Sequence, residues 1–100
     1  PLIRTYADGR IASAGALFGR RGLVERFAGR IAAAAERDAS YRVAVAHASD
    51  RDRAERLLAA LLERLPSVRA HYLTELGSAL GVHGGPGTLV VSLQRVAADG

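Results

Sequence analysis

The chain has 100 residues, a formal net charge of +4 at pH 7 and no cysteine. This length supports one small domain with a single hydrophobic core, and the lack of cysteine excludes disulfides and thiolate metal sites. The sequence shows no signal peptide and no apolar run long enough to cross a bilayer, so we expect a soluble segment, for which a cytoplasmic setting fits best. Because the chain begins at Pro1 without an initiator methionine, we also expect that it was cut from a longer protein.

The basic charge comes from arginine alone, and the fourteen arginines are scattered along the chain. A basic protein of this kind could bind nucleic acid, or act as a regulatory interaction module, and we keep that class as the alternative function. Only five residues are aromatic, however, so a stacking platform is missing along with a contiguous basic stripe. A solvated basic surface explains the charge equally simply, and we expect no nucleic acid as partner.

The first twenty residues predict a hairpin. Two short runs, Leu2 to Tyr6 and Arg10 to Ala14, flank the turn sequence Ala7-Asp8-Gly9. An Asp-Gly pair between such runs favours a type I′ turn, because that turn needs positive φ angles. We therefore expect the chain to open with two antiparallel strands.

The next segment predicts a helix over about 20–37, opened by the pair Arg20-Arg21. Its apolar residues recur at helical spacing: Leu23, Val24, Phe27, Ile31 and Ala35. Gly22 and Gly29 would each weaken this helix by about 1 kcal/mol relative to alanine. Packing of the apolar face must then hold the helix.

A short buried strand over 41–46 is predicted next, with β-branched residues between small ones. Ser49 is predicted to be the N-cap of a second helix over 50–65, because Asp52 follows three residues later. Pro66 would end this helix. The leucine-rich stripe of the helix is expected in the core: Ala54, Leu57, Leu58, Leu61, Leu62 and Leu65.

Three further strands are predicted, over 68–74, 79–82 and 88–93. Two helices cannot cover both faces of a sheet of five or six strands. We therefore predict an α+β fold, in which a mixed, largely antiparallel sheet carries both helices on one face. The other face of the sheet must then be covered by a partner or exposed to solvent.

A glycine-rich loop separates the last two predicted strands. His83 is followed by Gly84, Gly85, Pro86 and Gly87. The glycines permit a close approach of a ligand to the main chain, and the amides together with the imidazole could hold an anion. The alternative is a plain tight turn with a satisfied core histidine.

This loop resembles the C-terminal motif of the DegV family of bacterial fatty-acid-binding proteins. The motif reads Glu75-Leu76-Gly77 and then Gly81-Val82-His83-Gly84-Gly85-Pro86-Gly87. The similarity spans nearly the whole chain, since the opening hairpin, the Arg20-Arg21 pair and the strand from Tyr41 also fit in order.

The resemblance implies that the chain is the C-terminal lobe of a two-lobed carrier whose N-terminal lobe is absent here. Such carriers enclose a long-chain fatty acid and present its carboxylate to the catalytic subunit of a fatty acid kinase, without catalysis of their own. The residues matched to the head-group site are His83, Gly84, Gly85, Gly87 and Arg20. The chain departs from the family at Ser78, Gly84 and Phe18, where proline, threonine and arginine are usual.

The sequence lacks the residue combinations that an enzymatic function would need. The glycine loop has no Lys-Ser/Thr ending, and it leads into a strand, so neither nucleotide motif is present. The three histidines are too far apart in sequence to indicate a metal site, and we expect no cofactor. Glu75 and His83 could form an acid and base pair across neighbouring strands, or Glu75 could be a solvated carboxylate on the strand surface. His47 is either a ligand at a strand end or a turn residue that donates to a nearby carbonyl, and His71 should point outward.

Overall fold

The computed structural model describes residues 3–6, 9–14, 22–76 and 88–96. The elements in these residues are β1 (Ile3–Tyr6), β2 (Gly9–Ala14), α1 (Leu23–Ala33), β3 (Ser40–His47), α2 (Arg51–Arg64), β4 (Val68–Glu75) and β5 (Leu89–Val96). The predicted opening hairpin is confirmed, with Tyr6 of β1 opposite Gly9 of β2. The strand predicted over 79–82 lies outside the described residues.

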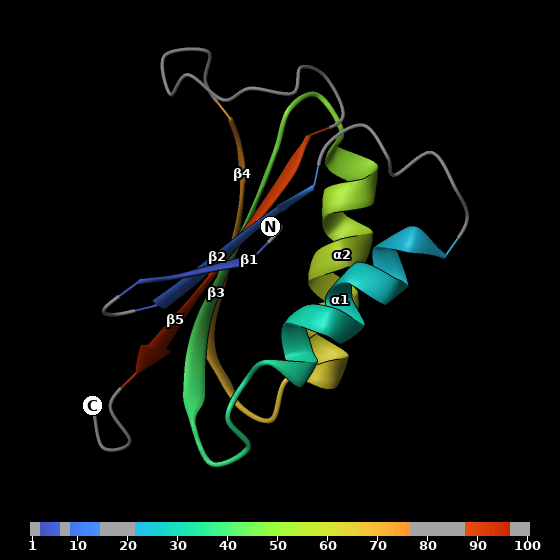
Figure 1. The fold of residues 1–100 in the computed structure, drawn as a ribbon. Helices are drawn as coiled ribbons and strands as arrows, with labels where there is room; N and C mark the ends of the chain where they lie inside the picture. Colours follow the sequence, from blue (N-terminus) through green and yellow to red (C-terminus); the bar gives the residue numbers. More distant parts are fainter. Residues whose placement is uncertain (1–2, 7–8, 15–21, 77–87, 97–100) are drawn as a thin grey trace.

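The five described strands form one sheet in the order β1-β2-β5-β3-β4. The β3–β4 pair is parallel, because α2 carries the chain back to the starting end of the sheet, and the other pairs are antiparallel. Figure 1 shows both helices on the same face of this sheet. The predicted α+β fold, a mixed and largely antiparallel sheet with two helices on one face, is confirmed.

The core lies between the sheet and the helices. Strand β3 buries every second residue, from Tyr41 to His47, and the adjacent β5 buries Leu89, Val91 and Leu93 in the same way. This alternation has the period of a strand with one covered face. The intervening residues of β3 and β5 face the side of the sheet that no described helix covers.

Helix α1 is shorter than predicted, because it begins at Leu23 and ends at Ala33. Gly22 is its N-cap and has a φ of 89°, so the expectation that Gly22 lies inside the helix was wrong. A positive φ breaks the helical path, and glycine adopts it without steric cost. The predicted apolar face is buried at Val24, Phe27 and Ile31.

Helix α2 matches its prediction within one residue at each end. The predicted N-cap was wrong: Asp50 occupies that position, and its side chain makes no capping hydrogen bond. Ser49 has a φ of 56° and lies in the turn before the helix. The predicted stripe is buried at Ala54, Leu57, Leu61 and Leu65, while Leu58 and Leu62 are half-buried.

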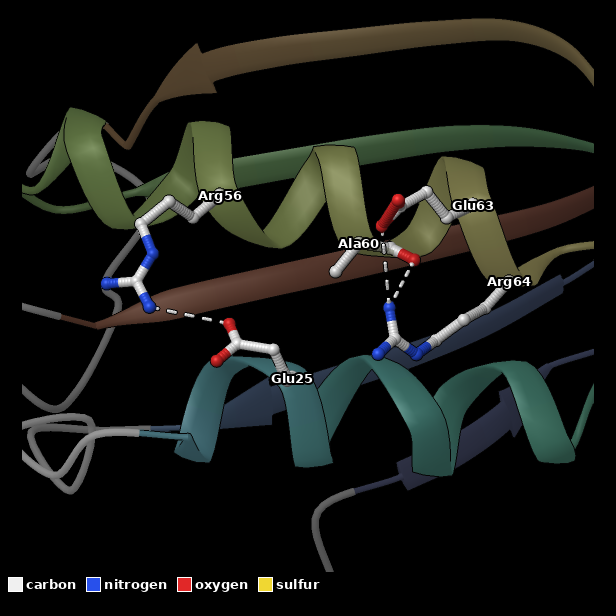
Figure 2. Close-up of polar contacts among 5 residues, drawn as sticks. All are labelled: Glu25, Arg56, Ala60, Glu63 and Arg64. Atoms are coloured by element: carbon white, nitrogen blue, oxygen red, sulfur yellow. Dashed lines mark hydrogen bonds and ion pairs between the residues drawn. The ribbon is translucent and has the colours of Figure 1, made fainter.

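The two helices lie against each other over the sheet. Figure 2 shows Arg56 of α2 reaching Glu25 of α1, at 3.4 Å between Nη2 and Oε2. Arg64 of α2 donates instead to the carbonyl of Ala60 in its own helix. Because the Glu25–Arg56 pair is exposed, it adds little to stability, and burial of the apolar faces holds the helices together.

Candidate functional site

Four strands end or begin in one row across the sheet. The register places Ala14 opposite Leu89, Leu89 opposite His47 and His47 opposite Glu75. This row, which we name the loop edge, contains the last residues of β2, β3 and β4 and the first residue of β5. Every connection that leaves these strands at the loop edge therefore starts or ends within a few strand spacings of His47.

The connection 77–87 is fixed at both ends beside His47. Strand β3 lies between β4 and β5 in the sheet, so Leu76 and Thr88, which flank segment 77–87, lie on opposite sides of β3. The amide of Leu76 donates to the His47 carbonyl at 2.7 Å, and the amide of Ala48 donates to the Thr88 carbonyl at 2.9 Å. The two residues that flank segment 77–87 are thus hydrogen-bonded to the last residue of β3 and to Ala48, which follows it.

All predicted site residues belong to two connections that meet the loop edge. Segment 15–21 follows Ala14, and segment 77–87 joins Glu75 and Leu76 to Thr88. These residues lie outside the described parts of the chain, and their roles stay predictions: Arg20, His83, Gly84, Gly85 and Gly87. The pairing of Glu75 with His83 is untested for the same reason.

A polar cleft of about 460 Å³ opens at the loop edge, between the end of β4 and the start of α2. Its lining residues are His47, Ser49, Arg51, Leu73, Thr74 and Glu75. Only Leu73 among them is apolar, so the cleft suits a polar or charged group better than an acyl chain. Arg51 and Glu75 are exposed at its rim.

His47 is buried, with 5% of its surface exposed, yet it lines this cleft. Its Nδ1 accepts a hydrogen bond from the Asp50 amide at 3.1 Å. The sequence left two alternatives, a ligand at a strand end or a turn residue that donates to a nearby carbonyl. In the turn Nδ1 is an acceptor, and no hydrogen bond between described residues has the His47 side chain as donor. The sequence singled out His47 because it lies where a predicted strand leads into a predicted helix. That signal does not tell which ring nitrogen donates or accepts a hydrogen bond.

The remaining sequence predictions concern His71, metal sites and membrane-spanning segments. His71 is exposed on β4, as predicted. Among the described residues, no group of three His, Cys, Asp or Glu side chains could hold a metal ion. No helix in those residues is long and apolar enough to cross a membrane.

A comparison with protein-family models matches residues 1–96 to the family described as "Uncharacterised protein, DegV family". This chain belongs to the DegV family. The match covers the hairpin, both helices and the loop edge, and it confirms the resemblance on which the site prediction depends. No curated protein matches the sequence.

Solved structures similar to this DegV chain share its fold. A hypothetical protein from Thermotoga maritima, described as revealing fatty acid binding function, has a TM-score of 0.66 and 18% identity, over 93% of this chain and 37% of that one. A fatty acid binding DegV protein from Streptococcus agalactiae has a TM-score of 0.61 and 21% identity, over 78% and 27%. A DegV protein from Ruminococcus gnavus, described with vaccenic acid, has a TM-score of 0.64 and 22% identity, over 74% and 26%.

The DegV chain therefore spans much less than half the length of these three proteins. At these identities the likeness concerns the fold, which includes the sheet whose loop edge is described above. The identity of any ligand must be argued from the site.

Proposed function

We propose that this DegV chain is the C-terminal lobe of a fatty-acid carrier, and that its loop edge holds the carboxylate of the lipid. The observation that carries this proposal is the row Ala14–Leu89–His47–Glu75, because both segments with predicted head-group residues connect to it. The solved DegV proteins described as binding fatty acid support the choice of ligand.

A carboxylate taken out of water needs charged or main-chain donors, whereas an acyl tail needs only an apolar slot. The loop edge offers the polar half of such a site, since the cleft between β4 and α2 has one apolar lining residue. We propose that a second, N-terminal lobe supplies most of the acyl slot. Tyr72, which is 55% exposed and lies beside Ala44 on the uncovered face of the sheet, is the apolar residue we assign to that lobe's docking surface.

In this proposal the carrier has no catalysis of its own. A separate kinase subunit transfers phosphate from ATP to the carboxylate that the loop edge presents. The basic interaction module, the alternative function, is disfavoured by the pairing of its charges. In the described part of the chain, five arginines have a carboxylate within 4 Å: Arg51, Arg53, Arg56, Arg64 and Arg95. A steeply salt-dependent affinity for DNA or RNA, with no lipid bound, would favour the alternative instead.

The test is calorimetry with a defined long-chain fatty acid on a polypeptide that carries both lobes. His83→Ala should weaken binding by about 1 to 3 kcal/mol, which is the cost of leaving a buried charged group without its partner. His71→Ala is the matched control, because this exposed histidine lies on β4 and has no assigned role. An unchanged affinity for His83→Ala would remove His83 from the site.

The 100-residue chain alone should not bind fatty acid tightly, because it lacks the proposed second lobe. Native mass spectrometry of the chain, purified from cells and then mixed with the same fatty acid, measures this directly. A stable one-to-one lipid complex of the isolated chain would contradict the division of the site between two lobes.

A further inference from the structure

The imidazole of His47 is held in one orientation and one tautomer. Its Nδ1 accepts the Asp50 N–H at 3.1 Å, so this nitrogen carries no proton and the ring proton resides on Nε2. The ring is packed among side chains and only 5% exposed. His47 therefore presents a fixed N–H donor whose direction is set by the main chain of the next turn.

This donor has no partner among the described residues. The hydrogen bonds of the described part of the chain use Nδ1 and the main chain of His47, and none uses Nε2. In the same residues, no fully buried side-chain nitrogen or oxygen lacks a partner. Nε2 is therefore not sealed away without a partner, and the cleft between β4 and α2 is a hollow of the described part of the chain that His47 lines.

The start of α2 adds main-chain donors to this cleft, together with the carboxylates of Asp50 at the N-cap and Asp52 in the first turn. The side chain of Asp50 makes no capping bond and lies 3.4 Å from Arg53, so the N-cap side chain does not cap the first turn of this 14-residue helix. Uncapped first-turn amides and the helix dipole both favour an anion. Arg51, the first residue of α2, lines the cleft as well, and its guanidinium lies 3.5 Å from the Glu55 carboxylate.

Glu75 limits the charge that the cleft can accept. It lines the cleft and lies opposite His47 in the strand register. The Glu75 carboxylate repels an anionic ligand in the cleft, and the repulsion is twice as large for a ligand with two negative charges. A singly charged carboxylate fits this balance better than a phosphate dianion does.

We propose that His47 Nε2 and the first turn of α2 bind a carboxylate monoanion in this cleft, as a head-group contact additional to the predicted glycine loop. That the carboxylate belongs to a lipid rests on the proposed function, but binding of a carboxylate can be tested without a lipid.

Two substitutions separate the acceptor role of Nδ1 from the donor role of Nε2. In His47→Asn the amide oxygen can replace Nδ1 as the acceptor for Asp50, while the Nε2 donor is lost. In His47→Gln the amide nitrogen can replace Nε2, while the acceptor is lost.

The first measurement is a ¹H–¹⁵N spectrum of the histidine ring nitrogens of the 100-residue chain, titrated with sodium acetate and, separately, with inorganic phosphate at pH 8. We expect acetate to shift His47 Nε2 saturably and to leave exposed His71 unchanged. His47→Asn should abolish saturable acetate binding, and His47→Gln should keep most of it. A silent Nε2 resonance, acetate binding unchanged in His47→Asn, or tighter binding of phosphate would each overturn the proposal.

The second measurement is fatty-acid affinity in a polypeptide that carries both lobes, for which His47→Asn should cost about tenfold. Melting temperatures of the two variants provide the folding control, with the larger decrease expected for His47→Gln. If fatty acid binds and His47→Asn does not weaken it, this inference fails and the proposed function stands. If acetate shifts His47 but no fatty acid binds, the proposed function fails and the carboxylate site stands.

Discussion

Two glycines near the start and middle of α1 should respond to the same substitution with opposite signs. Gly22 is the N-cap with a φ of 89°, whereas Gly29 lies within the helix. An added Cβ would meet no atom within 4 Å at either site, so only the backbone conformation distinguishes them. Gly29→Ala should raise the free energy of unfolding by about 0.8 to 1 kcal/mol, the difference in helix propensity.

Gly22→Ala should instead lower the free energy of unfolding by about 1 kcal/mol. A left-handed conformation costs alanine roughly 1 to 2 kcal/mol, of which part is recovered because the unfolded chain has fewer conformations. The two variants should thus differ by about 2 kcal/mol, or roughly 8 to 16 °C in melting temperature for a domain of this size. Thermal unfolding followed by circular dichroism measures the difference. An unchanged or raised melting temperature for Gly22→Ala would refute the positive φ at Gly22.

The core and one buried hydroxyl give two further predictions. Leu57→Ala should lower the free energy of unfolding by about 3 kcal/mol because Leu57 is fully buried, and Leu58→Ala by about half as much because its side chain is half-buried; equal shifts in urea midpoint would contradict this packing. Tyr41→Phe should lower it by about 1 kcal/mol, because the hydroxyl of Tyr41 accepts the Glu36 N–H at 2.8 Å. Tyr72→Phe, at an exposed residue, is the control and should leave stability unchanged, so a similar loss in both tyrosine variants would remove this role of the hydroxyl.

Local patterns in the sequence were sufficient for most of the fold. The Ser49 and Pro66 signals placed the ends of α2 within one residue, and the spacing of apolar residues gave its core stripe. The start of α1 could not be placed in this way. A glycine at helical spacing is compatible with either a helical or a positive φ, and the spacing alone does not distinguish them.

The cap of α2 shows a second limit of local patterns. Ser49 followed by Asp52 is typical of a helix start, but Asp50 is the N-cap in the structure. The backbone amide of Asp50 donates a hydrogen bond to Nδ1 of His47. That hydrogen bond comes from the end of β3 and competes with a local cap. A capping pattern that considers only the residues of the helix start does not include His47, which competes for the Asp50 amide.

The loop edge depends on contacts between residues far apart in sequence. Ala14, His47, Glu75 and Leu89 form one row only because β5 inserts between β2 and β3. The family resemblance placed Arg20 and the glycine loop in one site, and the sheet order now gives a physical reason why the connections that carry them begin or end at the same edge. Neither hydrophobic periodicity nor motif spacing determines strand order, so this part of the site required the structure.

His47 links the stability of the lobe to its proposed chemistry. Its ring occupies the last inward-facing position of β3, after Val43 and Val45, so the face of the sheet that forms the core also positions the donor. A large apolar replacement could keep the packing but would leave the Asp50 amide without its acceptor, at a cost of about 1 to 3 kcal/mol. Loss of binding in such a variant could not be separated from loss of the turn before α2. Only substitutions that replace one ring nitrogen at a time separate the two effects, which is why the comparison of His47→Asn with His47→Gln decides whether Nε2 acts on a ligand.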